Sequence, residues 1–155
     1  REHETRGRGE VMLRAGCRPT EGGHGWEGGR CEGCGETGKR LDFSHRLAQG
    51  QGGTWSAVNG LALCGPGGSG GCHGWASSRE RGLAERLGWL LRVGDDPMRV
   101  PVWMVTDTFP LGAWWLLGWF PTDPEPAGHV RVLAEAARYE LPERPSWGPP
   151  WAVWR

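Results

Sequence analysis

The sequence predicts a small α+β fold whose core is stapled by a metal ion, and three observations lead to that prediction. Two cysteine pairs, Cys31 with Cys34 and Cys64 with Cys72, frame the middle of the chain. Between the pairs, short segments alternate apolar and polar residues, as strands do. After them, leucines recur at helical spacing. Four thiolates in two pairs suit tetrahedral zinc, so we expect strand, loop, strand and helix around a structural Zn²⁺.

Length and composition limit the class of protein. The chain has 155 residues and zero formal net charge, so no global basic field indicates a nucleic-acid partner. Residues 28–92 are mildly basic and residues 93–155 mildly acidic. Gly and Pro are frequent, yet eleven tryptophans favour a folded core with long irregular loops, because disordered chains are poor in aromatic residues.

We divide the chain into an N-terminal arm (residues 1–27), a core (residues 28–93) and a C-terminal extension (residues 94–155) that packs on the core. Charges alternate in the arm and glycine is frequent, so only residues 10–15 are expected to form a short strand or one helical turn. Cys17 has no partner at ligand spacing and is interpreted as a bystander thiol.

The chain opens without an apolar signal segment, and none of its apolar runs approaches the ~18 residues of a membrane span. We therefore expect a cytoplasmic protein with no membrane partner. In a reducing compartment a Cys-x2-Cys pair more often binds metal or does redox chemistry than forms a disulfide. A thioredoxin-like redox pair is normally surrounded by a βαβ pattern, and the sequence around Cys31 and Cys34 does not show that pattern.

The cysteine motif begins with residues 31–35, CEGCG, whose glycines let the backbone turn so that two thiolates can face one metal ion. The second pair is stretched, with seven residues between Cys64 and Cys72. These residues are rich in glycine and can loop out, because each doubling of a flexible loop costs only about 0.6 kcal/mol.

Residues 41–47 alternate well enough for the first strand. In such a strand Asp42 and Ser44 point to one face, and Phe43 and His45 point to the other.

A glycine-rich loop follows, and residues 59–64 return as the second strand of the hairpin. The helix is expected to begin near Cys72 and to reach residue 91, although Gly82 and Gly88 each cost it about 1 kcal/mol and could break it in two.

In the extension, residues 100–105 and 112–120 are predicted to form a hairpin, residues 129–139 a last helix, and residues 141–155 an irregular tail rich in proline and tryptophan. Trp55, Trp75 and Trp89 are expected in the core. The tryptophans expected to pack the C-terminal hairpin on the core are Trp103, Trp114, Trp115 and Trp119.

His45, Asn59 and His73 lie in that order between and just after the cysteine pairs. Framed in this way, they resemble the HNH endonucleases, especially the short ones carried by tailed phages. The resemblance implies a ββα-metal (His-Me finger) core in which His45 is the general base. It also implies that Asn59 holds the loop that orients the base, and that His73 binds the catalytic cation.

Phosphodiester hydrolysis needs a base to activate water and a cation to hold the scissile phosphate. The family usually has Asp or His immediately before the base as the second metal ligand, where this chain has Ser44. A hydroxyl is a poorer ligand than a carboxylate. Asp42 lies on the same strand face, about 6.6 Å away at ~3.3 Å per residue, and could replace it. The cation implied is Mg²⁺ or Mn²⁺, with Zn²⁺ or Ni²⁺ as alternatives.

The family resemblance further implies contacts with the backbone of double-stranded DNA, largely indifferent to sequence. The candidate residues are Arg46, Arg79, Arg81 and Arg86. The competing interpretation for the arginines of the helix is a solvated face paired with Glu80 and Glu85.

The function that follows is a metal-dependent DNA endonuclease, cutting one strand or both. Resemblance to phage proteins suggests a phage-encoded enzyme in the host cytoplasm that acts in genome packaging with the terminase or portal. One alternative is a catalytically weak zinc-ribbon module that binds nucleic acid or a packaging protein. Another is a homing or defence nuclease with the same chemistry. Taken singly, each residue also has an ordinary interpretation. A histidine such as His45 could be a surface residue, Asn59 could belong to an Asn-Gly turn, and His73 could replace a cysteine as a zinc ligand.

Overall fold

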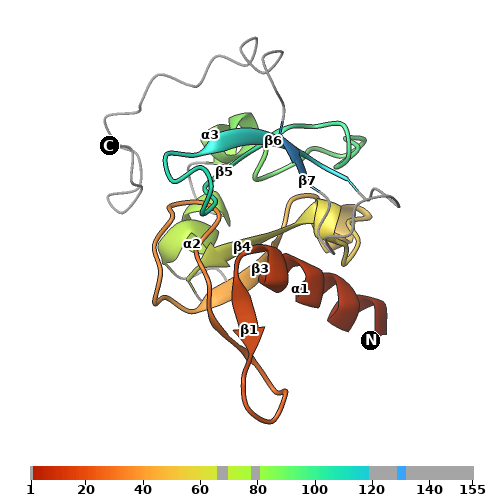
Figure 1. Cartoon of the computed structure of the whole chain (residues 1–155). Coiled ribbons are helices and arrows are strands. Elements are labelled where there is room, and N and C mark those ends of the chain that lie inside the picture. The colour runs from red at the N-terminus through yellow and green to blue at the C-terminus, as the bar shows by residue number, and fades with distance from the viewer. Residues whose placement is uncertain (1, 66–69, 78–80, 119–128, 132–155) are drawn as a thin grey trace.

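A hairpin of two short strands lies at the centre of the chain in a computed structural model, which describes residues 2–65, 70–77, 81–118 and 129–131 (Figure 1). The elements in chain order are α1 (Glu2–Arg14), β1 (Cys17–Pro19), β2 (Trp26–Gly28), β3 (Leu41–His45), η1 (Gln49–Gln51), η2 (Ala57–Asn59), β4 (Gly60–Cys64), α2 (Gly71–Ser77), α3 (Arg81–Arg86), β5 (Val102–Met104), β6 (Ala113–Leu117) and β7 (His129–Arg131). The strands form three antiparallel sheets, β1–β2, β3–β4 and β5–β6–β7. The fold is thus α+β with short antiparallel strand pairs.

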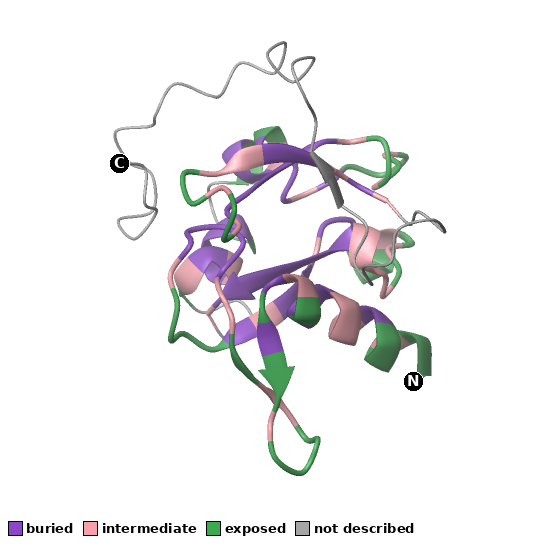
Figure 2. Cartoon of the chain, viewed as in Figure 1, coloured by how far each residue is buried: buried purple, intermediate pink, exposed green. Residues whose placement is uncertain are grey.

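The central hairpin is β3–β4. Its register runs from Leu41 opposite Cys64 to His45 opposite Gly60. Every residue of β4 is buried, because α1 and α2 both contact this strand (Figure 2). The hairpin predicted for the C-terminal extension is also present as β5 and β6.

The expectation for the N-terminal arm was wrong in its secondary structure. Residues 2–14 form the helix α1, which packs on the hairpin through the fully buried Val11 and Met12. Gly7 allows the close approach, since a Cβ there would overlap the backbone carbonyl of Trp55. With three apolar residues at one end and two glycines, α1 has little helical signal of its own, so tertiary contacts specify it. The division into arm, core and extension stays a prediction.

Arg14 attaches the end of α1 to the cysteine motif. Its Nε donates to Glu32 Oε1 at 2.6 Å and its Nη2 to Glu32 Oε2 at 2.8 Å, and both side chains are 2% exposed. The same guanidinium donates to the carbonyls of Ala57 and Gly60, while Glu32 accepts from the Ala62 amide. This buried network joins α1, the motif and the start of β4.

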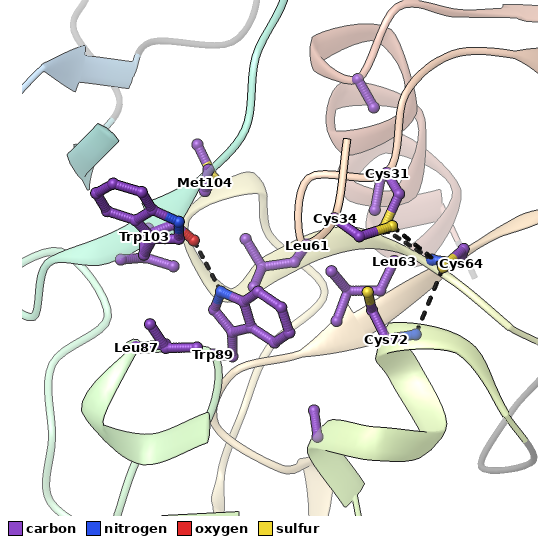
Figure 3. Close-up of a cluster of buried hydrophobic side chains, with 14 of the residues drawn as sticks. Cys31, Cys34, Leu61, Leu63, Cys64, Cys72, Leu87, Trp89, Trp103 and Met104 are labelled. Carbon is purple, nitrogen blue, oxygen red and sulfur yellow. Dashed lines mark hydrogen bonds between the residues drawn. The ribbon is translucent and has the colours of Figure 1, made fainter. Parts of the chain in front are cut away.

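The core contains the tryptophans that were expected there. Trp75 and Trp89 are buried with their rings edge to face. Figure 3 shows the hydrogen bond that Trp89 Nε1 donates to the Trp103 carbonyl, at 2.7 Å. Trp114 and Trp115 are buried on the C-terminal sheet. The expectation for these indoles is confirmed. Trp55 is half-buried, and Trp119 lies outside the described residues.

The helix expected from near Cys72 to residue 91, which was allowed to break in two, is present as α2 and α3, and it is shorter than expected because α3 ends at Arg86. Leu83 and Leu87 are nevertheless buried. In the extension, residues 129–131 form β7 on the edge of β6 where a helix was expected, because pairing satisfies the backbone groups of that edge. Residues 132–155, which include the rest of that helix and the tail, lie outside the described residues.

Candidate metal centre and the neighbouring histidines

Four cysteines from three parts of the chain meet in the core (Figure 3). Cys31 and Cys34 come from the motif before β3, Cys64 ends β4, and Cys72 lies in the first turn of α2. All four are buried, and their Sγ atoms lie within 4.8 Å of one another. The Sγ atoms of Cys34 and Cys64 are 3.8 Å apart, the spacing of about 3.8 Å that tetrahedral geometry gives for Zn–S bonds of ~2.3 Å. The cluster could therefore hold a structural metal ion such as zinc.

Backbone amides and the thiols themselves support the cluster. The Cys64 amide donates to Cys31 Sγ at 3.2 Å, and the Cys72 amide to Cys64 Sγ at 3.4 Å. Such bonds orient and stabilise metal-binding thiolates. The hydrogen bond with Cys31 is the main cause that lowers the pKa of Cys64 and raises that of Cys72, because the thiol that donates keeps its proton.

Glycines on both sides of the loop accommodate the wide spacing of the second cysteine pair. Gly65 and Gly71 adopt φ of +104° and +61°, and a Cβ at Gly71 would overlap the Cys64 carbonyl. Only glycine fits this approach of two backbone segments, so the ends of the loop meet and both sulfurs face the cluster. Residues 66–69 lie outside the described part of the chain.

Cys17 is not part of this cluster. It is buried, with Sγ 3.5 Å from the Gly28 carbonyl, and burial raises the pKa of its thiol. Its position agrees with the interpretation as a bystander.

His45 is the last residue of β3 and is half-buried in a cluster with two aromatic rings that also contact each other. Its ring centroid lies 4.8 Å from that of Phe43 and 4.4 Å from that of Trp55. Its Nε2 is buried and has no hydrogen-bond partner among the described residues. Burial lowers the pKa of His45, with a smaller contribution from the charge of His73, so the imidazole is neutral at pH 7.

His73 follows Cys72 on α2 and has the same character. Its Nδ1 is buried and lacks a hydrogen-bond partner in the described part of the chain. Burial lowers the pKa of His73, while the carboxylate of Asp42 opposes that shift. His73 therefore interacts electrostatically with both His45 and Asp42. Among the described residues, the four cysteines are the only group of three or more metal-binding side chains at ligand spacing. His45, His73 and Asp42 do not form a second group of this kind.

The two candidates for a second ligand differ in exposure. Asp42 is half-buried, and its Oδ1 lies 3.7 Å from Arg8 and 4.0 Å from Arg40. Ser44 is buried, at 3% exposure. Asp42 is the one whose charge acts on His73, and sequence reasoning missed that Arg8 on α1 reaches it, because α1 itself was not expected.

Asn59 is buried and holds the loop that follows β3. Its Oδ1 accepts from the Leu47 amide at 2.7 Å, and its Nδ2 donates to the carbonyls of Leu47 and Thr54 at 3.0 Å. Asn59 therefore fixes the loop between Leu47 and Thr54 to the residue that precedes β4. This loop begins two residues after His45.

The expectation that Arg46 meets phosphates was wrong. Its side chain is fully buried and donates to five backbone carbonyls. Arg46 therefore stabilises the chain around α3 and β5 and is not available to phosphates. The acceptors are the carbonyls of Gly88, Val58, Pro97, Val100 and Pro101, at 2.7–3.5 Å. Burial, with a smaller contribution from Arg14, lowers the pKa of Arg46 to about 9, so the guanidinium stays charged at neutral pH.

The remaining arginine candidates lie on or near α3. Arg81 and Arg86 are exposed. Arg81 pairs with Glu85 at 3.2 Å one helical turn later, as the interpretation of a solvated face required, and Arg92 also bonds Glu85. Arg79 lies outside the described residues.

Comparisons with protein-family models, with curated proteins and with solved structures found no match. Within the described ranges, no helix is both long enough and apolar enough to cross a membrane. Fold and site together thus define a small α+β protein with a four-cysteine cluster that could hold a metal ion.

Proposed function

We propose that the protein is a metal-dependent DNA endonuclease of the ββα-metal type. One observation carries the proposal: two buried imidazole nitrogens, His45 Nε2 and His73 Nδ1, lack hydrogen-bond partners among the described residues, and His73 interacts electrostatically with both His45 and the Asp42 carboxylate. Buried polar atoms are normally satisfied, and unsatisfied ones often mark a catalytic role or an ion-binding site.

The order of elements supports the proposal. The hairpin β3–β4 leads into α2, with His45 on the first strand and His73 on the helix. His73 directly follows Cys72, so a metal ion in the cysteine cluster would fix the start of α2 and, with it, the position of His73. The structural metal ion would in this way help to position a residue of the catalytic site.

The side chains support named roles in hydrolysis. His45, neutral because burial lowers its pKa, can accept a proton from water. Asn59 fixes the loop beside it and acts as a positioning residue. His73, with Asp42 or Ser44, would hold the catalytic divalent cation. Mg²⁺ or Mn²⁺, or alternatively Zn²⁺ or Ni²⁺, would supply charge to stabilise the scissile phosphate and the leaving oxygen.

The proposed substrate is double-stranded DNA. Resemblance to short phage HNH proteins extends the proposal to a phage enzyme that works in the host cytoplasm with the terminase or portal during packaging. With Arg46 buried, Arg81 and Arg86 remain as candidates among the described residues for contacts with the DNA backbone.

A second candidate function is a zinc-stapled module that binds nucleic acid or a packaging protein without cutting. Two observations favour it: Ser44 stands where the family has an acidic residue or histidine, and the net charge is zero. The absence of a second ligand cluster from the described residues also fits it.

Plasmid nicking separates the two functions. The zinc-loaded chain is incubated with supercoiled plasmid and Mg²⁺ or Mn²⁺, beside His45→Ala and His73→Ala. His3→Ala is the matched control, because His3 is an exposed histidine near the start of α1 and lies outside the site. We expect nicking by the wild type and the control and loss in the other two. Equal nicking by His45→Ala would remove the assignment of the base, and no nicking by any protein would favour the module.

A further inference from the structure

A cavity of about 400 Å³ lies beside Asp42, where α1, the β1–β2 loop and the start of β3 meet. We call it the hairpin cavity, and the side chains that give it chemical character are Arg8, His24, Trp26, Arg40 and Asp42. Its volume falls within the roughly 300–1,000 Å³ of sites that bind small molecules. Most of its wall comes from residues outside the cysteine and histidine motifs.

The charges of the hairpin cavity leave it positive. Arg8 and Arg40 both point to one oxygen of Asp42, at 3.7 and 4.0 Å, the outer limit of ion pairing. Their side chains are 41% and 78% exposed. Such solvated pairs are weak. A phosphate group that offers two or more oxygens can therefore compete with one carboxylate for both guanidinium groups.

The cavity also has an aromatic wall. Trp26 is half-buried and rests on α1, since a Cβ at Gly9 would lie 3.6 Å from its Cζ2. An indole held in place beside two arginines is the combination with which proteins bind unpaired nucleotides, because the base stacks on the ring and the phosphate meets the guanidinium.

The cavity adjoins the site proposed above. Asp42 belongs to both, and His45 lies three residues further along β3, about 10 Å at ~3.3 Å per residue. We propose that the hairpin cavity binds one unpaired nucleotide of a DNA strand, with its phosphate on Arg8 and Arg40 and its base on Trp26. The orientation of the strand toward His45 rests on the proposed endonuclease function, whereas the binding itself does not. A base stacked inside a duplex cannot enter such a cavity, so the preferred form is single-stranded or frayed.

The test is fluorescence anisotropy of a labelled single-stranded oligonucleotide with the full zinc-loaded chain and no added Mg²⁺ or Mn²⁺. Arg8→Gln/Arg40→Gln should reduce the slope of log K against log[salt] by about 1.4, since each phosphate contact on a single strand contributes about 0.7. Trp26→Ala should weaken binding about fivefold or more, and Trp26→Phe less. Arg99→Gln is the control, because Arg99 is 87% exposed and pairs with Asp96 on another loop.

The proposal is overturned if the double variant keeps the wild-type slope, or if Arg99→Gln lowers the slope as much. An unlabelled duplex of the same sequence should compete more weakly than the single strand, and equal competition would overturn the unpaired base. Zinc content and circular dichroism establish that each variant is folded. If the cavity variants weaken binding but no protein nicks plasmid, the nucleotide-binding cavity is supported and the endonuclease proposal fails. If nicking requires His45 but binding does not depend on the cavity residues, the endonuclease proposal is supported and the cavity proposal fails.

Discussion

Arg14 and Glu32 form a two-point ion pair that is almost completely buried, between the last residue of α1 and the cysteine motif. Glu32 lies between the two metal-binding candidates Cys31 and Cys34, so the N-terminal helix is bonded to the same short segment that provides half of the cluster. The helix and the cluster should therefore stabilise each other.

Breaking this pair should strongly destabilise the protein. Arg14→Met leaves the Glu32 carboxylate buried without its partner, and such losses cost roughly 3–5 kcal/mol. The free energy of unfolding in urea measures it. Arg6→Met is the control, because Arg6 pairs with Glu10 on the same helix but is 70% exposed, and should change stability by less than about 1 kcal/mol. Similar losses in both variants would contradict the buried role.

Removing the metal should unfold the core, because four buried cysteines then lack the ion that joins three segments of the chain. We expect one Zn²⁺ per chain by native mass spectrometry, and loss of the ion and of cooperative unfolding in Cys72→Ser. Cys17→Ser should keep the ion, since Cys17 lies outside the cluster. A metal-free chain that stays folded would refute the staple.

The parts of the fold that sequence could predict are those encoded locally. The alternation of residues 41–47 indicated β3, residues 59–64 were expected to return beside it as β4, and ligand spacing predicted that four cysteines come together. The glycines of the second pair were expected to let a flexible loop form, whereas Gly65 and Gly71 in the structure allow two backbone segments to approach closely.

The parts that it could not predict depend on distant partners. The α1 helix has only Val11 and Met12 as fully buried apolar residues, and its contacts lie on segments remote in sequence. Arg46 stands beside a predicted catalytic histidine, yet four of its five acceptors belong to residues 88–101. Nothing near position 46 in the sequence indicates that its charge would be buried.

Arg46 should be required for stability. Arg46→Lys keeps a charge but presents three donors where the guanidinium serves five carbonyls, so acceptors are left unsatisfied. Each buried unsatisfied group costs about 1–3 kcal/mol, and we expect a loss in that range or above in urea unfolding. Arg99→Lys, at an exposed position, should be nearly neutral. If Arg46→Lys were instead as stable as the wild type and bound DNA more weakly, Arg46 would be a DNA contact after all.

The pH dependence of stability should report on His45. Burial lowers its folded-state pKa below the ordinary value near 6.5, so the unfolded chain binds the extra proton first as pH falls. Stability linked to His45 is therefore fully present above about pH 6.5 and declines as pH falls toward the folded-state pKa.

His45→Gln removes the contribution of His45 to the pH dependence. As pH falls from 7.5 to 5.5, the wild type should therefore lose more unfolding free energy than His45→Gln, measured in urea without added Mg²⁺ or Mn²⁺. Protonation of the cysteine cluster affects both proteins and cancels in the difference. His24→Gln, at an exposed position, tests whether any histidine gives the same result. A difference for His45→Gln that does not change with pH would mean that the imidazole is as easily protonated in the folded chain as in water.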